Sequence, residues 1–366
     1  MADPFEKSPE DCQGSGKSTL QLEAEKTAAQ KPSLRLVFMG TPDFAADILA
    51  SLLKASFITV AAVYCQPDRP AGRGKKLQAP PVKQLALEHG LPVFQPQNFK
   101  ADPAGDAAWA QLSALTPDVL AVAAYGLVLP QRVLDIARLM PVNVHASLLP
   151  KYRGAAPIQR AIMAGEAVTG VTIMRMEAGL DTGPILMQRA VGIDLNDNSA
   201  DLHNELAREG ADLLLLALER LSAGTLHAIR QDEALATYAH KLTKEESRLN
   251  LDLPARALHA RIRGLCPWPG ARLNLVRPGK EDLQVLVEPG VFPLHPDMKM
   301  AVDAFVESLG GPPVPGTIIG LSQGALLVAC ADGAYAFTRL RPAAGKSMDA
   351  AAFANGYLAG GEAMFT

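Results

Sequence analysis

The residues of this sequence that are best suited to chemistry are an amide, an imidazole and a carboxylate in one central stretch. Asn143 and His145 lie two positions apart in a short β-type run, so their side chains leave the same face of a strand. A second predicted strand, residues 168–176, leads to Asp181 in a loop flanked by glycines. Such groups, meeting at neighbouring strand ends, can stabilise an oxyanion and move a proton. We therefore predict one catalytic site built from these three side chains.

Each of these residues also has a purely structural interpretation. Asn143 could cap the end of a strand, His145 could be a core histidine with satisfied hydrogen bonds, and Asp181 could close an Asx turn. Ser147 raises the separate alternative of a serine hydrolase, but it lacks a G-x-S-x-G elbow and no oriented base is evident for it. The combination of all three groups in one motif favours the catalytic interpretation.

The sequence NVHASLLPKYRGAAPIQ at residues 143–159, followed by Asp-Thr-Gly at 181–183, closely resembles the formyltransferase motif of the methionyl-tRNA formyltransferase family. The resemblance implies 10-formyltetrahydrofolate as the formyl donor. Formyl transfer to an amine passes through a tetrahedral centre, for which Asn143 and His145 would supply hydrogen-bond donors. Asp181 would orient His145 and help to take the proton lost by the amine. No metal is expected, because an amine is a competent nucleophile and no ligand cluster is present.

Related motifs occur in other enzymes that use this donor, so the motif indicates the donor and leaves the acceptor open. Residues 147–150 would present backbone groups to the pterin or formyl end of the donor, as the resemblance implies. The apolar loop 125–130 follows a strand predicted at 118–124, and open α/β sheets bind ligands at the carboxyl ends of their strands. For Leu127 and Leu129, simple core packing is an equally good interpretation. The predicted donor-binding residues are Ser147, Leu148, Leu149, Pro150, Gly126 and Leu127.

Residues 66–76, with the sequence QPDRPAGRGKK, form a predicted loop in which basic residues alternate with glycine and proline. Such a loop cannot build a core, but it can reach for phosphates. A solvated surface loop is the alternative. The loop resembles the tRNA-contacting loop of the same family, which implies that it holds the acceptor stem. The predicted tRNA-binding residues are Arg69, Arg73, Lys75 and Lys76.

The elements that must position these residues are typical of a doubly wound, Rossmann-like α/β domain with a parallel sheet. A buried-type strand at 34–39 ends at Gly40 and passes into an amphipathic helix. No G-x-G-x-x-G follows, so a nicotinamide-dependent dehydrogenase loses its main support. After residue 145 the chain passes through a basic turn, residues 151–154, into a short helix. Further strands are predicted at 58–64, 93–94, 118–124 and 185–193, and helices at 81–89, 107–115 and 200–221.

We predict four regions along the chain. Residues 1–33 form a flexible extension, 34–222 the catalytic domain, 223–240 a linker, and 241–366 a C-terminal tRNA-binding domain. Short alternating runs predict a small OB-like β-barrel there, which is the fold of the C-terminal domain in the family. The proline-rich segment 293–315 is interpreted as an inserted loop. Strands are predicted at 271–276, 283–287, 317–321, 325–329 and 334–340.

Composition limits the function. A chain of 366 residues, 48% of them hydrophobic, can bury a substantial core, and its length indicates two domains or one large one. A net charge of −3 excludes a protein that coats nucleic acid over its whole surface, although a local basic surface is compatible with it. The four cysteines are too scattered for a metal knuckle and are interpreted as reduced. No run has the length of a membrane span and no signal core is present, which favours a cytoplasmic protein.

The leading hypothesis is therefore an enzyme that formylates the α-amino group of methionine on initiator tRNA, for translation initiation. A second hypothesis keeps the formyl donor but changes the acceptor to water, a nucleotide sugar or a purine precursor. A third is a tRNA-binding protein that has the fold without the activity. The basic loop and the added domain favour tRNA over a small acceptor, and the intact catalytic motif argues against an inactive protein. No protein partner is indicated by the sequence.

Overall fold

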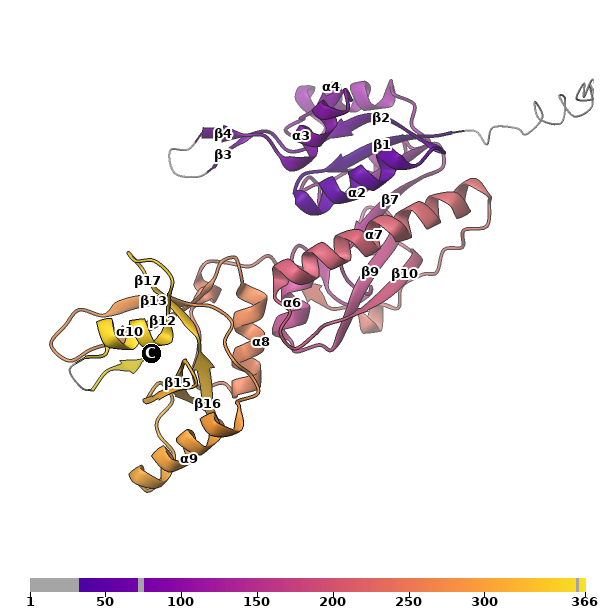
Figure 1. Ribbon diagram of the computed structural model, residues 1–366. Helices are drawn as coiled ribbons and strands as arrows, with labels where there is room; N and C mark the ends of the chain where they lie inside the picture. Colours follow the sequence, from indigo (N-terminus) through magenta and orange to yellow (C-terminus); the bar gives the residue numbers. More distant parts are fainter. Residues whose placement is uncertain (1–32, 72–75, 360–361) are drawn as a thin grey trace, which may run out of the picture. The chain divides into compact units, whose positions relative to one another are not determined.

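The computed structural model describes residues 33–71, 76–359 and 362–366. Its first part is built on a seven-stranded sheet with the strand order β10-β9-β7-β6-β1-β2-β5. Figure 1 labels β1, β2, β7, β9 and β10 of this sheet. The strands are β1 (Leu34–Gly40), β2 (Ile58–Tyr64), β5 (Val93–Phe94), β6 (Val119–Ala123), β7 (Met140–His145), β9 (Val168–Arg175) and β10 (Ile185–Gly192). The neighbouring strands β7, β6, β1, β2 and β5 are parallel. At the β7 edge, β9 pairs antiparallel with β7, and β10 pairs antiparallel with β9. The predicted doubly wound α/β fold is confirmed.

The strand order reverses beside β1, because the chain goes from β1 to β2 on one side and later returns to β6 on the other. In sheets of this kind, ligands bind outside the carboxyl ends of the strands at the reversal. The ends of β1, β6 and β7 are neighbours in the sheet, so the segments that follow them lie around one position. Gly40 ends β1, and the other two segments are the loop after β6 and the motif after His145.

Helices cover both faces of the sheet. One face carries α2 (Asp43–Lys54), α3 (Pro81–Glu88), α6 (Pro157–Met163) and α7 (Ser199–Ser222), and the other carries α4 (Pro103–Ser113) and α5 (Gln131–Leu134). Alternation along β1 divides the core in the same way, since Leu36 and Phe38 pack under the first group and Val37 and Met39 under the second. Both faces of the strands are therefore buried, as parallel sheets require.

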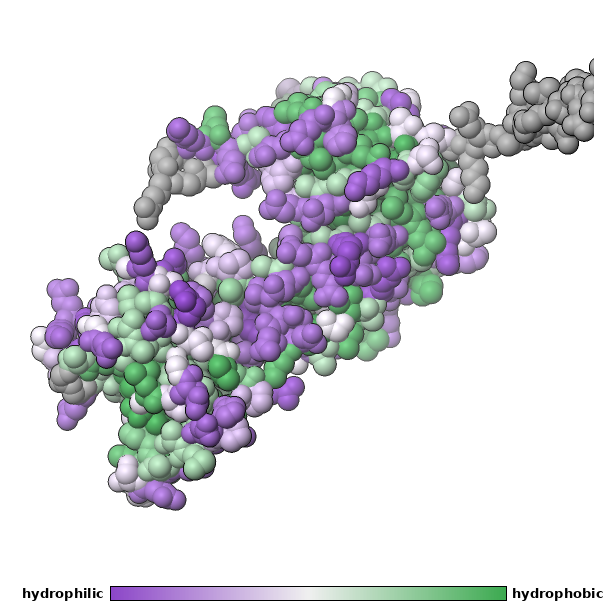
Figure 2. Space-filling view, viewed as in Figure 1, coloured by the Kyte–Doolittle hydropathy of each residue, from purple (hydrophilic) through white to green (hydrophobic). Residues whose placement is uncertain are grey.

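The long helix α7 is amphipathic. Leu206 and Leu214 are buried against the sheet, while Arg208 and Asp212 are exposed. Its outer face belongs to a hydrophilic area near the centre of Figure 2. Among the described residues, none of the helices combines the length and the apolar character that crossing a membrane requires.

The basic segment 66–76 contains one short strand and the first residue of a second, where the sequence predicts only a loop. β3 (Arg69–Ala71) and β4 (Lys76–Gln78) pair antiparallel, with Arg69 opposite Gln78 (Figure 1). Arg69, Pro70 and the residues of β4 are exposed, and the sequence of the two strands has no alternating apolar pattern that would predict them. Two of the predicted tRNA-binding residues, Arg73 and Lys75, lie outside the described residues.

After α7, the chain returns to the loops that follow β7 and β9. β11 (Tyr238–Ala239) pairs in parallel with β8 (Arg153–Gly154), and Ile229 forms a bridge with Ile185. A short 3-10 helix, Glu233–Leu235, lies between these contacts. The predicted linker is therefore hydrogen-bonded to the first part of the chain through much of its length.

The second part is a small β domain of antiparallel strands, with a five-stranded sheet β18-β17-β13-β12-β19 and a three-stranded sheet β14-β15-β16. The strands are β12 (Ala271–Val276), β13 (Leu283–Val287), β14 (Ile318–Ser322), β15 (Ala325–Cys330), β16 (Gly333–Phe337), β17 (Arg339–Pro342), β18 (Met348–Asp349) and β19 (Met364–Phe365). The helices are α8 (Ala255–Leu265), α9 (Pro296–Leu309) and α10 (Ala350–Tyr357), and a 3-10 helix spans Glu245–Ser247. The five predicted strands are present, although the last of them divides into β16 and β17.

The interpretation of 293–315 as a loop is wrong, because the segment contains α9. The ring of His295 caps the start of this helix by accepting a hydrogen bond from a backbone N–H, and Gly310 ends it with a φ of 70°. Met298 and Val302, one turn apart, are buried against β15 and β16. The prolines that suggested a loop lie mainly outside the helix or at its first position, where proline is tolerated.

Candidate active site

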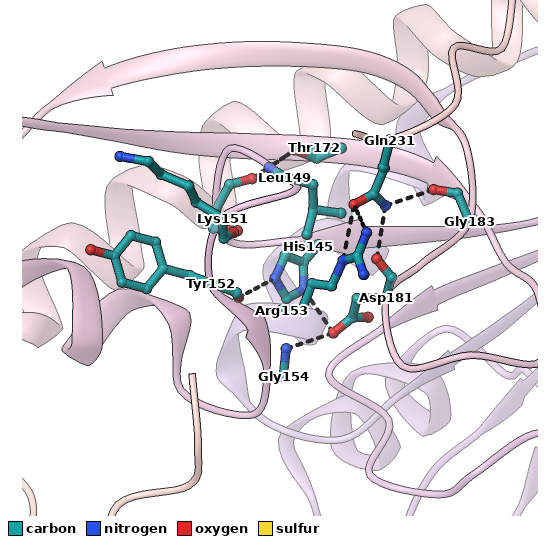
Figure 3. Close-up of polar contacts among 11 residues, drawn as sticks. His145, Leu149, Lys151, Tyr152, Arg153, Gly154, Thr172, Asp181, Gly183 and Gln231 are labelled. Carbon is teal, nitrogen blue, oxygen red and sulfur yellow. Dashed lines mark hydrogen bonds and ion pairs between the residues drawn. The ribbon is translucent and has the colours of Figure 1, made fainter. Parts of the chain in front are cut away.

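The structure brings His145 and Asp181 together at the carboxyl end of β7. His145 is the last residue of that strand, and Asp181 lies in the turn between β9 and β10. The Nδ1 atom of His145 is 3.7 Å from Oδ2 of Asp181. The same oxygen accepts a hydrogen bond of 2.8 Å from the backbone N–H of Gly154 (Figure 3). Two of the three predicted catalytic side chains therefore meet.

The two ring nitrogens of His145 have different surroundings. Nε2 lies 2.9 Å from the carbonyl oxygen of Tyr152, and a carbonyl can only accept, so Nε2 carries a hydrogen that it donates. That bond leaves Nδ1 as the position that can gain or lose a proton during a reaction. A proton on Nδ1 would lie beside the carboxylate of Asp181, whose Oδ2 is 3.7 Å away.

Asn143 lies two residues before His145 in β7 and is half-buried. Its backbone pairs with Val122 of β6 on one side and Met174 of β9 on the other. Alternation along the strand places it on the same face as His145. Its role as an oxyanion donor stays a prediction.

The turn that carries Asp181 has an unusual backbone. The φ angle of Asp181 is 55°, in the left-handed region that aspartate tolerates better than most residues. Two residues later, Gly183 packs so tightly that a Cβ atom would lie 1.8 Å from the carbonyl oxygen of Arg175. The glycine that follows Asp181 in the sequence motif is therefore required by the close approach of two backbones.

Residues 147–150 are held by hydrogen bonds within the chain. Ser147 is fully buried, and its hydroxyl donates to the carbonyl of Lys151 at 2.7 Å. The hydroxyl of Thr172 donates to the carbonyl of Ser147 at 2.7 Å and accepts from the N–H of Leu149 at 3.1 Å. Gln188 donates to the carbonyl of Leu149 at 2.8 Å.

These contacts give the Ser147 hydroxyl a structural partner and no base, which does not support a serine hydrolase. The carbonyl groups of Ser147, Leu149 and Pro150 all accept hydrogen bonds from within the chain. The carbonyl of Pro150 accepts from the N–H of Thr237. Leu148 is half-buried and packs near Gly170. The part that residues 147–150 play in binding the formyl donor stays a prediction.

The loop after β6 is fixed to the end of β1. The hydroxyl of Thr41 donates to the carbonyl of Tyr125 at 2.9 Å, and the loop then turns at Gly126, whose φ is 83°. Gly126 is exposed and Leu127 half-buried, whereas Leu129 belongs to the core under β6. Core packing is thus observed for Leu129, and donor binding by Gly126 and Leu127 stays a prediction.

The basic hairpin is anchored at its base. Arg69 is exposed, yet its Nη2 donates to Oε1 of Gln66 at 3.0 Å. Asp68 accepts hydrogen bonds from Gln95 and from Lys83, and these bonds hold the pKa of the Asp68 carboxyl below its ordinary value. Lys76, at the start of β4, is exposed as a phosphate contact requires. Binding of tRNA by these residues stays a prediction.

Several residues around the site were not anticipated from the sequence. Arg153, in the turn that the sequence shows only to be basic, is fully buried, and its guanidinium is bonded to Gln231 and Glu233. Hydrogen bonds to Glu233 raise the pKa of Arg153 above its ordinary value. Thr172 had a visible signal, as a polar residue within an apolar strand. No pattern in the sequence indicated Gln231, because its partners Asp181 and Gly183 are 50 and 48 positions away.

Comparison with known proteins identifies the family. Residues 34–218 match the family model described as formyl transferase, and residues 241–358 match that of the formyl transferase C-terminal domain. A methionyl-tRNA formyltransferase of Nitratidesulfovibrio vulgaris is 50% identical over 331 residues, which cover 90% of this chain and 95% of that protein. A methionyl-tRNA formyltransferase of Pseudomonas fluorescens is 48% identical over 316 residues, covering 86% and 91%.

Solved structures show the same fold at low identity. HypX from Aquifex aeolicus, in complex with tetrahydrofolic acid, has a TM-score of 0.54 at 16% identity, covering 89% of this chain and 48% of HypX. An N-formyltransferase from Helicobacter canadensis, in complex with folinic acid and dTDP-3-aminofucose, has a TM-score of 0.54 at 16% identity, covering 83% and 98%. Because both family models match and relatives share about half of their residues over nearly their whole length, the chain belongs to the methionyl-tRNA formyltransferase family.

Proposed function

We propose that this enzyme transfers a formyl group from 10-formyltetrahydrofolate to the α-amino group of methionine carried on initiator tRNA. The product is N-formylmethionyl-tRNA, which serves translation initiation. The observation that carries the proposal is the pair of His145 and Asp181, 3.7 Å apart where β7 ends. It occurs in a chain that is half identical to proteins named methionyl-tRNA formyltransferase.

The reaction begins with attack by the methionine amine on the formyl carbon. A model α-amine has a pKa near 8, so a useful fraction is uncharged at neutral pH. As the new carbon–nitrogen bond forms, the formyl oxygen gains negative charge, and the side-chain amide of Asn143 can donate to it. One lost donor of this kind typically costs about a hundred- to a thousandfold in rate. The attacking nitrogen loses one proton, the bond to the folate nitrogen breaks, and the folate nitrogen takes up one proton as it leaves, so the protons balance.

His145 and Asp181 handle the proton in this scheme. Since Nε2 already donates to the carbonyl of Tyr152, the ring gains and loses the proton at Nδ1. A protonated Nδ1 can donate to the oxyanion, and Asp181 stabilises the charge that the ring then carries. The N–H of Gly154 fixes the carboxylate oxygen that faces the ring. Positioned proton transfer contributes roughly a hundred- to ten-thousandfold in rate.

We infer that the pterin of the donor lies between the loop after β6 and residues 147–150. The supporting observation is that both segments follow neighbouring parallel strands, β6 and β7, at the point where the strand order reverses. The internal hydrogen bonds of Ser147 and Leu149 make the second segment a rigid wall of this site. Gly126 is exposed, so a ligand can approach the backbone there closely.

We infer that the exposed hairpin β3–β4 contacts the acceptor stem through its basic residues. Arginine and lysine side chains bind phosphates by charge, and arginine adds paired hydrogen bonds. The supporting observation is that Arg69 and Lys76 are exposed on a hairpin whose base is fixed to the sheet. For Arg73 and Lys75, contact with the acceptor stem is inferred from the resemblance of this loop to the tRNA-contacting loop of the family.

A single assay tests the proposed function. The wild-type protein is mixed with 10-formyltetrahydrofolate labelled in the formyl group and with charged initiator tRNA, and label on methionine is followed as salt is raised. We expect transfer at low salt and a decline in apparent affinity as salt rises, because phosphate contacts release counterions. Label in free formate alone, or transfer to free methionine as readily as to charged tRNA, would replace the proposal by a small-acceptor activity.

A further inference from the structure

The segment that returns from α7, residues 229–239, holds both loops that carry the predicted catalytic groups. At its start, Ile229 exchanges two backbone hydrogen bonds of 2.8 Å with Ile185, just after the Asp181 turn. Near its end, the carbonyl of Thr237 accepts from the N–H of Arg153 at 2.8 Å. We call this segment the return segment. Its backbone contacts connect the β7 loop with the β9–β10 turn.

Gln231, in the middle of the return segment, touches the Asp181 turn directly. Its Nε2 donates to the carbonyl oxygen of Asp181 at 2.8 Å and to that of Gly183 at 2.7 Å. Its Oε1 accepts from Nε and Nη2 of Arg153 at 3.1 and 2.9 Å (Figure 3). Because a guanidinium only donates and a carbonyl only accepts, the orientation of this amide is determined, and all of its hydrogen-bonding positions are used.

The Asp181 turn needs this support. A residue with a φ of 55° persists in a packed structure only where its surroundings hold it. Gln231 binds carbonyl groups on both sides of the turn, so it fixes the direction in which the Asp181 side chain leaves the backbone. That direction determines the 3.7 Å separation between the carboxylate and Nδ1 of His145.

Arg153 holds Gln231 in turn. Its fully buried guanidinium donates to both carboxylate oxygens of Glu233 at 2.8 Å, which satisfies the charge. The residues on either side of Arg153 contact the predicted catalytic pair, since Tyr152 accepts from His145 and Gly154 donates to Asp181. One tripeptide therefore fixes the ring, the carboxylate and the amide that supports the turn.

We propose that Gln231 is a positioning residue for formyl transfer, which acts through the backbone of the Asp181 turn without touching either substrate. The inference rests on the proposed function and extends it, because it makes the return segment a part of the active site. A connection between domains would tolerate any polar residue at this position. A positioning residue requires two N–H donors on one side and an acceptor on the other.

The test is the substitution Gln231→Glu. The change preserves the length of the side chain and the acceptor for Arg153, but it places a carboxylate oxygen against the carbonyls of Asp181 and Gly183. We expect kcat for formylation of charged initiator tRNA to fall by about ten- to a hundredfold, since small misplacements of reacting groups have effects of this size. We expect KM for both substrates and the thermal midpoint to stay close to the wild-type values. The matched control is Gln111→Glu, an exposed residue of α4.

A second variant, Gln231→Met, removes the donors without adding charge, and it is used if the glutamate variant fails to fold. Loss of kcat with unchanged KM and unchanged melting in either folded variant supports the inference. Wild-type kcat in a folded variant would overturn it. A loss of activity that merely follows a loss of thermal stability would overturn it as well. Absence of formyl transfer by the wild-type protein would instead count against the proposed function.

Discussion

His145 uses its two ring nitrogens for different purposes, and the difference follows from its hydrogen bonds. Nε2 is fixed by the carbonyl of Tyr152, so the ring cannot rotate without losing a buried bond. Nδ1 faces Asp181, whose own position depends on Gly154 and on the turn that Gln231 supports. Which ring nitrogen faces Asp181 is thus determined by backbone groups that the sequence motif encodes only indirectly.

Thr172 gives a prediction at the same scale. Its buried hydroxyl bonds to Ser147, Leu149 and Gln188, whereas the buried hydroxyl of Thr169 in the same strand has no partner among the described residues. Thr172→Val keeps the shape and leaves those groups unsatisfied, so we expect the free energy of unfolding to fall by about 1–3 kcal/mol. Urea denaturation measures the change. Thr169→Val is the control, and an equal loss in both variants would contradict the prediction.

At the scale of elements, strands β1, β2, β12 and β13 could be predicted almost to the residue, because buried or alternating apolar patterns identify them. Helix α9 could have been found, since Met298 and Val302 have helical spacing, but the neighbouring prolines suggested a loop. The hairpin β3–β4 carries no such pattern. The convergence of His145 and Asp181 followed from a motif, whereas the contacts of Gln231 and Arg153 join segments that are distant in sequence and leave no periodic signal.

The hairpin β3–β4 supports a prediction about tRNA use. Lys76→Ala removes an exposed charge at the start of β4, and we expect a higher KM for charged initiator tRNA with an unchanged KM for the formyl donor. The slope of log affinity against log salt is negative, and its magnitude should become smaller by about one, as expected for the loss of one phosphate contact. The control is Lys54→Ala, an exposed lysine at the end of α2. Equal salt slopes in the wild type and the Lys76 variant would contradict the hairpin's assignment.

At the scale of the whole molecule, α8 of the C-terminal part is bonded to the turn between β10 and α7. Nε2 of the buried His259 donates to the carbonyl of Leu195 at 2.8 Å, and Nδ1 accepts from the hydroxyl of Tyr335 at 2.9 Å. Arg263, one turn further along α8, donates to the carbonyls of Asp194 and Asp197. The β domain therefore contacts the segment that leads into α7, the helix from which the return segment starts.

We expect His259 to make the free energy of unfolding dependent on pH. Burial lowers the pKa of His259 below its ordinary value of 6.5, and the nearby Arg263 acts in the same direction. The unfolded chain therefore binds the proton first, so the stabilisation is complete above pH 6.5 and decreases as the pH falls below it. We expect the free energy of unfolding to decrease between pH 7.5 and pH 5.5, by about 1.4 kcal/mol for each unit of pKa difference that this interval spans.

Urea denaturation at the two pH values measures this dependence. His259→Gln should lessen the difference between them, because the variant has no group at this position that gains a proton. His227→Gln, which changes an exposed histidine, is the control and should leave the difference unchanged. An unaltered pH dependence in the His259 variant would show that other groups cause it.

Formyl transfer by the Asp181→Asn variant tests the central claim most directly. The asparagine can still accept the hydrogen bond from Gly154, so the substitution removes the negative charge beside Nδ1 of His145 and little else. With labelled 10-formyltetrahydrofolate and charged initiator tRNA, we predict that the wild type forms N-formylmethionyl-tRNA. The variant should do so roughly a hundred- to ten-thousandfold more slowly, with KM values little changed. A variant that keeps the wild-type rate would contradict a reaction carried by the pair of His145 and Asp181.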